Sequence, residues 1–255
     1  MDIRAKRREH GSEIAVIDTD VLYEEKGRFR VLEFANGDVQ GALDLDDPDR
    51  IVLEYPRAIA HLMEQGDPPF ERAFMIGHGI GTIARHFAGR DMRTAEISAT
   101  IAEWSREYFG YDGPAVKVGD GRELLAAEPD GSLDYIVLDA FTERGTPWHL
   151  FTREFFKLAE RKLNERGAIL LNVFGKGRRD SFTEAVWAGL SETFAHTRGF
   201  ALPADGPNDA TNRILAGAKV PIEAKPRQMA GFRPSDPEIG TVLEDGMFGY
   251  GGGNR

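Results

Sequence analysis

Hydrophobic and polar positions follow one rhythm in the first 45 residues and another after residue 72. Residues 13–45 alternate apolar and polar side chains in two runs, "EIAVIDTDVLYEE" and "RFRVLEFANGDVQGALDL". Alternation with period two is typical of strands, and Lys26-Gly27 and Asn36-Gly37 supply turn residues. This pattern predicts a small antiparallel β domain within residues 1–50.

After residue 72, short apolar runs such as "RAFMIG" and "YIVLDAF" alternate with amphipathic helical segments. A helical pattern that starts or breaks near Pro56 precedes them. Strict alternation of strand and helix predicts βαβ units. We therefore expect an α/β domain over residues 51–220, a Rossmann-like, mostly parallel sheet with helices on both faces. Residues 221–255 contain several prolines and end in "GYGGGNR", which predicts a partly disordered C-terminal extension.

Composition excludes several classes of function. The chain has 255 residues, no cysteine and a net charge of −10, which argues against disulfides, thiol chemistry and general nucleic-acid binding. The basic start, "MDIRAKRREH", precedes no apolar segment and is expected to be a solvated tail. No apolar run approaches the ~20 residues of a membrane span. We expect a cytoplasmic globular protein that binds neither nucleic acid nor membrane.

The stretch "FMIGHGIGT" places three glycines, Gly77, Gly79 and Gly81, directly after an apolar run and before a helical segment. Such a loop lies at the carboxyl edge of an open α/β sheet, where ligands bind. Glycines permit a tight turn and close backbone approach, and the helix offers unpaired N–H groups. The last glycine of the dinucleotide pattern would fall at Thr82, so a nicotinamide or flavin is disfavoured.

Three carboxylates follow in register at successive strand ends. Glu96 can accept both hydroxyls of a ribose. Asp120, next to Gly121 in "VGDG", can accept a hydrogen bond from an adenine amino group, and Asp139 ends the fourth strand. Together with the glycine loop, they form the layout of an adenosyl-sulfonium site, as in class I S-adenosylmethionine-dependent transferases.

These elements resemble a particular family. The glycine loop, "AEIS", "VGDGRELL", "YIVLDAFTERGTPWHLFTREFFKLAERKLNERGAILLNVF" and the preceding β unit are similar to the spermidine synthase family, especially its bacterial spermidine-synthase-like branch. The resemblance covers roughly residues 20–220. It implies a small N-terminal β domain, a Rossmann-like domain, a homodimer, and transfer of an aminopropyl group from decarboxylated S-adenosylmethionine to putrescine or a related amine.

The resemblance also implies roles for individual residues. Glu96 would hold the ribose and Asp120 the adenine. Asp139 would face the reacting amine, and Gln40 and Tyr55 would line the pocket from the N-terminal side. Because a sulfonium is already an activated electrophile, the enzyme needs mainly orientation and one acceptor for the nucleophile's proton, and Asp139 is the candidate.

The acceptor half of the family pattern is altered. Ile80 stands where the glycine loop has an aspartate for the aminopropyl ammonium. Thr142 replaces the second carboxylate of the acceptor loop, with Glu143 one step later, and both are predicted to contact the substrate. Pro56 and Arg57 replace a polar residue and a glutamate, and Arg57 is expected to add a repelling charge. A diammonium substrate needs carboxylates to compensate its lost hydration, so the site is predicted to take a different nucleophile.

Two alternatives remain open from the residues. Without an aspartate at Ile80, the donor could be intact S-adenosylmethionine or its decarboxylated form, so the chain could be a methyltransferase on the same scaffold. A non-catalytic nucleoside-binding protein is the other alternative, against which the three retained carboxylates argue. His78 and His149 are further polar candidates, and no metal is expected.

Overall fold

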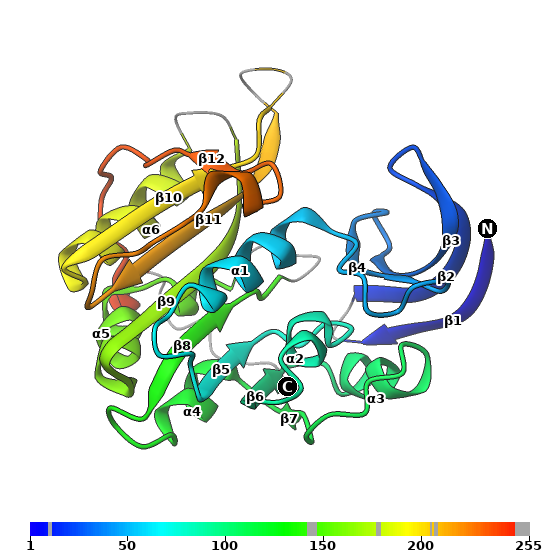
Figure 1. Ribbon diagram of the computed structural model, residues 1–255, viewed down its shortest axis with the longest axis horizontal. Coiled ribbons are helices and arrows are strands. Elements are labelled where there is room, and N and C mark those ends of the chain that lie inside the picture. Colours follow the sequence, from blue (N-terminus) through cyan, green and yellow to red (C-terminus); the bar gives the residue numbers. More distant parts are fainter. Residues whose placement is uncertain (10–11, 142–146, 177–179, 205, 207–208, 248–255) are drawn as a thin grey trace.

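The computed structural model describes residues 1–9, 12–141, 147–176, 180–204, 206 and 209–247. Within them, a four-stranded antiparallel sheet is followed by an eight-stranded mixed sheet with helices on both faces (Figure 1). This confirms the predicted α/β architecture with a preceding small β domain.

The N-terminal sheet has the strand order β1-β2-β3-β4, with every neighbouring pair antiparallel. Its strands are β1 (Asp2–Glu9), β2 (Ser12–Leu22), β3 (Glu25–Phe34) and β4 (Val39–Asp44). Alternate side chains enter two different apolar clusters: Val16 and Leu32 belong to one that includes Trp104, whereas Ile17 and Val31 belong to another that includes Leu53. The period-two pattern therefore buries both faces of this sheet.

The basic start of the chain is a strand and not the tail that we expected. Residues 2–9 form β1 along the edge of the N-terminal sheet, paired with β2. Its side chains stay mostly exposed, and their charges are matched across the ladder, with Arg4 on Asp18 and Lys6 on Glu13. Backbone pairing thus orders a segment that lacks the apolar alternation by which strands are recognised.

The large sheet has the order β12-β10-β11-β9-β8-β5-β6-β7. Its strands are β5 (Arg72–Ile76), β6 (Asp91–Glu96), β7 (Lys117–Val118), β8 (Leu133–Leu138), β9 (Leu163–Lys176), β10 (His196–Ala201), β11 (Ala210–Ala218) and β12 (Arg233–Pro234). The strands from β7 to β9 pair in parallel, and those from β9 to β12 pair antiparallel. The chain runs outward from β5 through β6 to β7 and then returns to β8 on the other side of β5. The order reverses there, which is where open α/β sheets bind ligands.

Helices cover both faces of this sheet (Figure 1). They are α1 (Glu54–Glu64), α2 (Thr82–His86), α3 (Ala99–Glu107), α4 (Gly121–Ala126), α5 (Arg153–Lys162) and α6 (Ser181–Thr193), with short 3₁₀ turns η1 (Trp148–Leu150), η2 (Pro226–Gln228) and η3 (Asp245–Met247). One core cluster joins the strands to α4, α5 and α6, and another joins them to α1 and α2. Ile136 and Leu138 enter the first cluster and Val137 enters the second, as expected for a strand buried on both faces.

The C-terminal segment packs on the large domain as far as it is described. β12 pairs with β10, and Met229 and Phe232 are buried in the cluster around α1. Leu243 joins the opposite cluster. Residues 221–247 therefore extend the core of the α/β domain, while the domain limits at residues 50 and 220 stay predictions.

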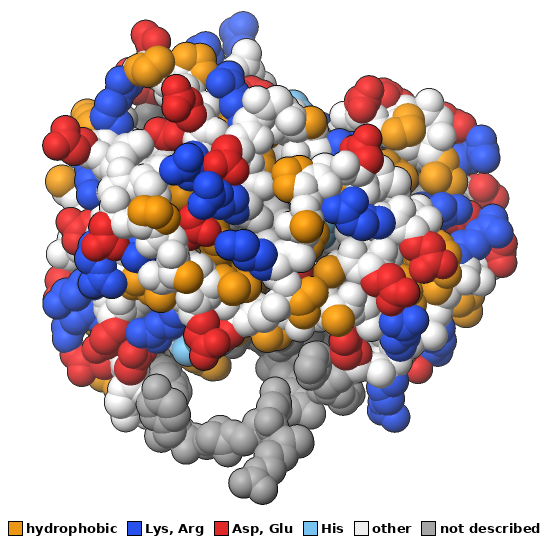
Figure 2. Space-filling model, turned by 90° about the horizontal axis from the view of Figure 1, so that it is seen from below, with side chains coloured by type: hydrophobic (Ala, Val, Ile, Leu, Met, Phe, Trp, Pro, Cys, Tyr) orange, Lys and Arg blue, Asp and Glu red, His pale blue; other side chains and the backbone are white. Residues whose placement is uncertain are grey.

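Charged side chains of both signs are interspersed over the face drawn in Figure 2. No helix among the residues described above is long and apolar enough to cross a membrane.

Candidate active site

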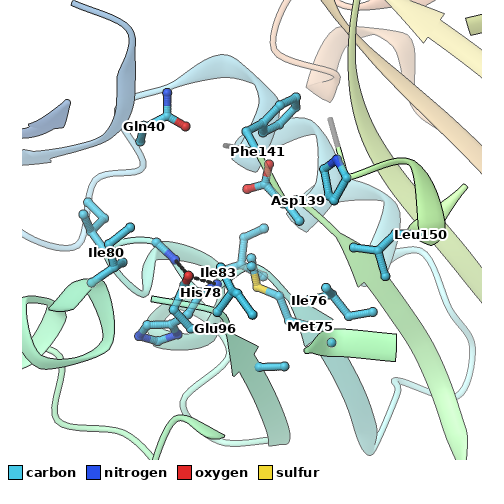
Figure 3. A pocket seen from close by; sticks show the side chains of 18 of the residues that line it. Gln40, Met75, Ile76, His78, Ile80, Ile83, Glu96, Asp139, Phe141 and Leu150 are labelled. Carbon is cyan, nitrogen blue, oxygen red and sulfur yellow. Dashed lines mark hydrogen bonds between the residues drawn. The ribbon is translucent and has the colours of Figure 1, made fainter. Parts of the chain in front are cut away.

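A cavity of about 310 Å³ lies at the carboxyl edge of β5, β6 and β8, under the N-terminal sheet (Figure 3). It is lined by Leu32, Phe34, Gln40, Tyr55, Pro56, Met75, Ile76, Gly77, His78, Gly79, Ile80, Thr82, Ile83, Ala95, Glu96, Ile97, Ile101, Gly119, Asp120, Gly121, Asp139, Ala140, Phe141, Pro147, His149 and Leu150. The predicted loop and the three strand-end carboxylates thus meet around one space. Most of its remaining lining is apolar.

The glycine loop needs its glycines for different reasons. Gly77 has φ of +91°, and a Cβ there would lie 2.0 Å from the carbonyl oxygen of Asp139, so β5 and β8 could not approach. Gly81 precedes α2 with φ of +85°, and a Cβ there would collide with the Tyr111 ring. Gly81 does not line the cavity. At Gly79 the space is nearly open. The loop is therefore shaped first by packing, and its Gly77–Gly79 part borders the cavity.

Glu96 holds this loop in place. Its Oε2 accepts hydrogen bonds from the backbone N–H groups of His78 (3.0 Å) and Gly79 (3.3 Å), and its Oε1 accepts one from Ser98 (3.0 Å). The dashed lines in Figure 3 follow the contacts of Glu96 with the loop. Burial raises the pKa of Glu96, and the backbone N–H groups oppose that rise. The carboxylate that we assigned to the ribose is thus also a structural brace.

Asp120 begins α4 and is doubly engaged. Its Oδ1 accepts hydrogen bonds from the backbone N–H groups of Arg122 and Glu123, and its Oδ2 lies 2.8 Å from Nε2 of His149. The contact with His149 is the main cause that lowers the pKa of Asp120. Gly121 fits close to Ile76 of β5, where a Cβ would lie 2.3 Å from Cγ2. The partnership of His149 with Asp120 could not be read from the sequence.

Asp139 follows β8, and its carboxylate projects into the cavity between α1 and the sheet (Figure 3). Its Oδ1 accepts a hydrogen bond of 2.9 Å from Nδ2 of Asn172. The Tyr55 hydroxyl donates to the carbonyl oxygen of Gln40 at 3.5 Å and lies near Asp139. Burial raises the pKa of Asp139 to about 6. The polar contacts with Asn172 and Tyr55 oppose this rise, and the negative charge of Glu96 adds to it. A carboxylate of this kind is a suitable proton acceptor near neutral pH.

The altered positions fall in three different places. Ile80 is 3% exposed and packs with Leu32 and Phe34 of the N-terminal sheet, so an apolar contact replaces the expected carboxylate. Pro56 lines the cavity, but Arg57 does not. The Arg57 side chain is exposed and lies 3.3 Å from Glu54 on the surface of α1, so the expected repelling charge is wrong. Thr142 and Glu143 lie outside the described residues.

Gln40 lines the cavity from β4, and its amide donates to the carbonyl oxygen of Asp38. His78 lines the cavity and lies 3.2 Å from the Ser105 hydroxyl, and burial lowers its pKa to about 4. His78 is therefore neutral at physiological pH. Among the residues that the structure describes, no three His, Asp or Glu side chains are grouped to hold a metal ion.

The C-terminal segment reaches the rim of the site. Arg122, in the first turn of α4, makes two hydrogen bonds to the carboxylate of Asp245, at 2.8 and 2.7 Å, and a third to the carbonyl oxygen of His149. The Thr152 hydroxyl donates to Oδ1 of Asp245 as well. The segment thus ties the start of α4 to the turn that carries His149.

We expect Asp245→Ala to lower the free energy of unfolding by about 1–2 kcal/mol at pH 7, because a bidentate, part-buried ion pair is lost. Its pair with Arg122 lowers the pKa of Asp245 in the folded protein. The ion pair therefore stabilises the fold at pH values above the ordinary pKa of aspartate, and this stabilisation is lost as the pH falls through the lowered pKa. Denaturant unfolding measures it. Glu244→Ala, which removes a more exposed pair with Arg153, is the control and should cost less. Equal losses in both variants would contradict this role.

Comparison with known proteins identifies similar sequences. A sequence model of the spermine/spermidine synthase domain covers residues 53–174. A probable polyamine aminopropyl transferase of Bifidobacterium longum is 34% identical over 158 residues, 58% of this chain and 33% of that protein. A polyamine aminopropyltransferase of Chromobacterium violaceum is 28% identical over 177 residues, 65% of this chain and 66% of that one. The matched part of this chain, residues 53–174, belongs to the spermine/spermidine synthase family.

Solved structures agree on the fold. A probable spermidine synthase from Corynebacterium glutamicum superposes with a TM-score of 0.80 at 23% identity, covering 96% of this chain and 98% of that one. The spermidine synthase of Thermotoga maritima gives 0.64 at 17% identity, over 95% and 81% of the two chains. Against the curated relatives from Bifidobacterium longum and Coffea arabica, the match spans only 33% and 44% of their length.

Proposed function

We propose that this protein transfers an alkyl group from an adenosyl-sulfonium donor to an amine or a similar nucleophile. The donor is decarboxylated S-adenosylmethionine or S-adenosylmethionine, and the expected product of aminopropyl transfer is 5′-methylthioadenosine. The observation that carries this proposal is the meeting of Glu96, Asp120 and Asp139 with the glycine loop around one cavity. Membership in a family of aminopropyltransferases supports it.

The nucleoside would lie across the loop Gly77–Gly79, with its ribose on Glu96 and its adenine near Asp120 and Gly121. For the adenine amino group to reach Asp120, it must share or displace the contact with His149. Gln40 would close the pocket from the N-terminal sheet. The sulfonium then lies towards Asp139, and the chain's own contribution is to orient the donor, exclude water with the apolar lining and accept the proton.

The acceptor side of the cavity favours a nucleophile with few charges. Among the described lining residues, the carboxylates are Glu96, Asp120 and Asp139, and the first two are engaged by backbone N–H groups and His149. Asp139 is left for the acceptor, and apolar side chains such as Phe141, Pro56 and Ile83 line the cavity together with Tyr55. We therefore propose an altered acceptor site that takes a monoamine or another nucleophile of low charge.

Methyl transfer from intact S-adenosylmethionine is the second candidate, and the packing of Ile80 favours it. Ile80 is buried among apolar side chains and offers no partner to the ammonium of an aminopropyl group. A donor that is not selected by that ammonium could be S-adenosylmethionine itself. The reaction products separate the two candidates, since aminopropyl transfer releases 5′-methylthioadenosine and methyl transfer releases S-adenosylhomocysteine.

Calorimetric titration with both donors, side by side, tests the nucleoside site. We expect Glu96→Ala to weaken donor binding by about 1–3 kcal/mol, the scale of lost hydrogen bonds to a charged group. Because Glu96 also braces the loop, Glu128→Ala is the control. Glu128 is a buried carboxylate that pairs with Arg93 and Lys117 away from the cavity, so its loss should cost stability without weakening the donor. An unchanged dissociation constant in Glu96→Ala would sink the assignment.

A further inference from the structure

A line of side-chain amides runs from β11 through β9 to the candidate catalytic carboxylate. Nδ2 of Asn212 donates to Oδ1 of Asn172 at 3.0 Å, and Nδ2 of Asn172 donates to Oδ1 of Asp139 at 2.9 Å. Asn212 and Asn172 lie on the neighbouring strands β11 and β9, and Asp139 directly follows β8, the next strand of the large sheet. Asn172 is 2% exposed in the middle of the apolar run "AILLNVF", where a polar side chain needs a specific reason.

The sheet geometry explains why the three side chains meet. On β9, Asn172 alternates in phase with Leu170, which faces the α1 side of the sheet, and on β11 Asn212 is in phase with Ile214 on that same side. Val137 of β8 is in phase with Asp139 and also faces α1. The three polar groups therefore continue three apolar rows to the carboxyl edge, where Tyr55 of α1 and Asp139 line the same cavity.

The two amides lock each other's orientation. Asn212 supplies a donor to the oxygen of Asn172, so the NH₂ group of Asn172 is the end that faces Asp139. A reversed Asn172 amide would place its oxygen against the Asp139 carboxylate and its NH₂ against the NH₂ of Asn212. Both contacts would be repulsive, and the buried Asn172 side chain has little access to water that could relieve them.

We propose that Asn172, oriented by Asn212, is the positioning residue that keeps Asp139 ionised and aimed at the acceptor. This inference rests on the proposed function and assigns residues to the same site. The amide occupies Oδ1 of Asp139 with a donor, which favours the carboxylate over the carboxylic acid. Among the described residues, the groups that face Asp139 are Tyr55 from α1, Glu96 from β6 and Asn172 from β9, and of these Glu96 favours the protonated form.

The Asn172 amide matters because the protonated and ionised forms of Asp139 are close in free energy near neutral pH. Burial and Glu96 already raise the pKa of Asp139 to about 6, with Asn172 acting against them. Without the amide, the proton would be held to a higher pH, and less of the enzyme would carry the ionised acceptor near neutrality. The acid limb of the pH–rate profile should therefore move to higher pH when Asn172 is lost.

The matched control lies on the same two strands. Asn164 of β9 donates to Oδ1 of Asp134 on β8 at 2.7 Å, the same amide-to-carboxylate pair at the opposite edge of the sheet. Asn164→Ala removes this pair far from the cavity. It should leave the pH–rate profile unchanged, so it reports any general effect of breaking an Asn–Asp bond between β8 and β9.

The experiment compares kcat and KM over pH 5–9 in Asn172→Leu, Asn212→Ala, the double variant and Asn164→Ala. We expect Asn172→Leu to move the acid limb by about one pH unit, which lowers kcat about twofold at pH 7 and nearly tenfold at pH 5, with the donor KM little changed. Asn212→Ala should move the limb less, in the same direction. The double variant should match Asn172→Leu, because Asn212 acts only through Asn172.

A second readout does not depend on turnover. The carboxyl carbon resonance of Asp139, assigned by its loss in Asp139→Asn, should titrate at a higher pH in Asn172→Leu than in the unmodified protein. If no donor and acceptor pair is turned over, the proposed function fails while this titration still tests the amide line. An unmoved Asp139 titration in Asn172→Leu, or in Asn212→Ala if the first variant does not fold, overturns the inference.

Discussion

Replacing Asp139 by asparagine should nearly abolish transfer at pH 8 and, at the same pH, make the protein more stable. The activity is lost because an amide cannot accept the proton of the attacking nucleophile, and removal of a positioned general base costs about 10²–10⁴-fold in rate. Asparagine keeps the size of the side chain and can still accept the hydrogen bond from Asn172. The cavity therefore keeps its shape.

The gain in stability follows from the raised pKa of Asp139. An unfolded aspartate ionises near its ordinary value of 3.8, whereas the folded one holds its proton up to about 6. Between these values the native state binds more protons, so the free energy of unfolding falls as the pH rises from about 4 to 6 and stays lower above. A displacement of this size corresponds to about 3 kcal/mol. We expect a gain of about 1–3 kcal/mol above pH 6, because the carboxylate is only part-buried.

Thermal and denaturant unfolding at pH 8, 6 and 5 measure this effect, and the gain should shrink towards the lowest pH. Asp134→Asn is the control on the same strand. Asp134 accepts bonds from the backbone N–H groups of Glu71 and Arg72 and from Asn164, so its amide variant should lose stability. If Asp139→Asn is less stable than the unmodified protein at pH 8, then burial of the ionised Asp139 carboxylate does not destabilise the fold and this prediction is wrong.

The large sheet was predictable because its buried strands have a recognisable pattern of apolar residues in the sequence. Residues 135–138 are continuously apolar because they are covered on both faces, and the amphipathic segments between the strands mark the covering helices. The same periodicity fixes which end of each strand carries a carboxylate, so Glu96, Asp120 and Asp139 could be expected to meet. They do line one cavity.

What the sequence could not supply depends on contacts between distant segments. β1 is ordered by pairing with β2 and carries no apolar alternation. Arg57 was expected to face the acceptor, but the phase of α1 turns it to the surface while Tyr55 and Pro56 face the cavity. Asn172 was a detectable signal, a single amide inside an apolar strand, yet its partner Asn212 is 40 residues further along the chain.

Putrescine should be a poor acceptor, by roughly a thousandfold relative to an amine with one charge. A diammonium chain that enters the cavity loses hydration at both ends, and each ammonium then needs a partner. Among the described lining residues, Glu96 is already bonded to the glycine loop, and Asp120 to the start of α4 and to His149. Asp139 is the carboxylate that remains for an ammonium. An unpartnered, desolvated ammonium costs several kcal/mol, which corresponds to a rate loss of that order.

Pentylamine is the matched comparison, because it has the length of putrescine with one ammonium replaced by a methyl group. Apolar lining residues such as Phe141 and Ile83 can pack against that methyl group, whereas they offer nothing to a charge. The measurement is kcat/KM for both amines with decarboxylated S-adenosylmethionine, followed by the release of 5′-methylthioadenosine. We expect the ratio to favour pentylamine at every pH above the acid limb set by Asp139. Efficient turnover of putrescine, near 10⁴ M⁻¹s⁻¹ on the order-of-magnitude scale of ordinary enzymes, would show that a second carboxylate serves the acceptor and that the site is not altered.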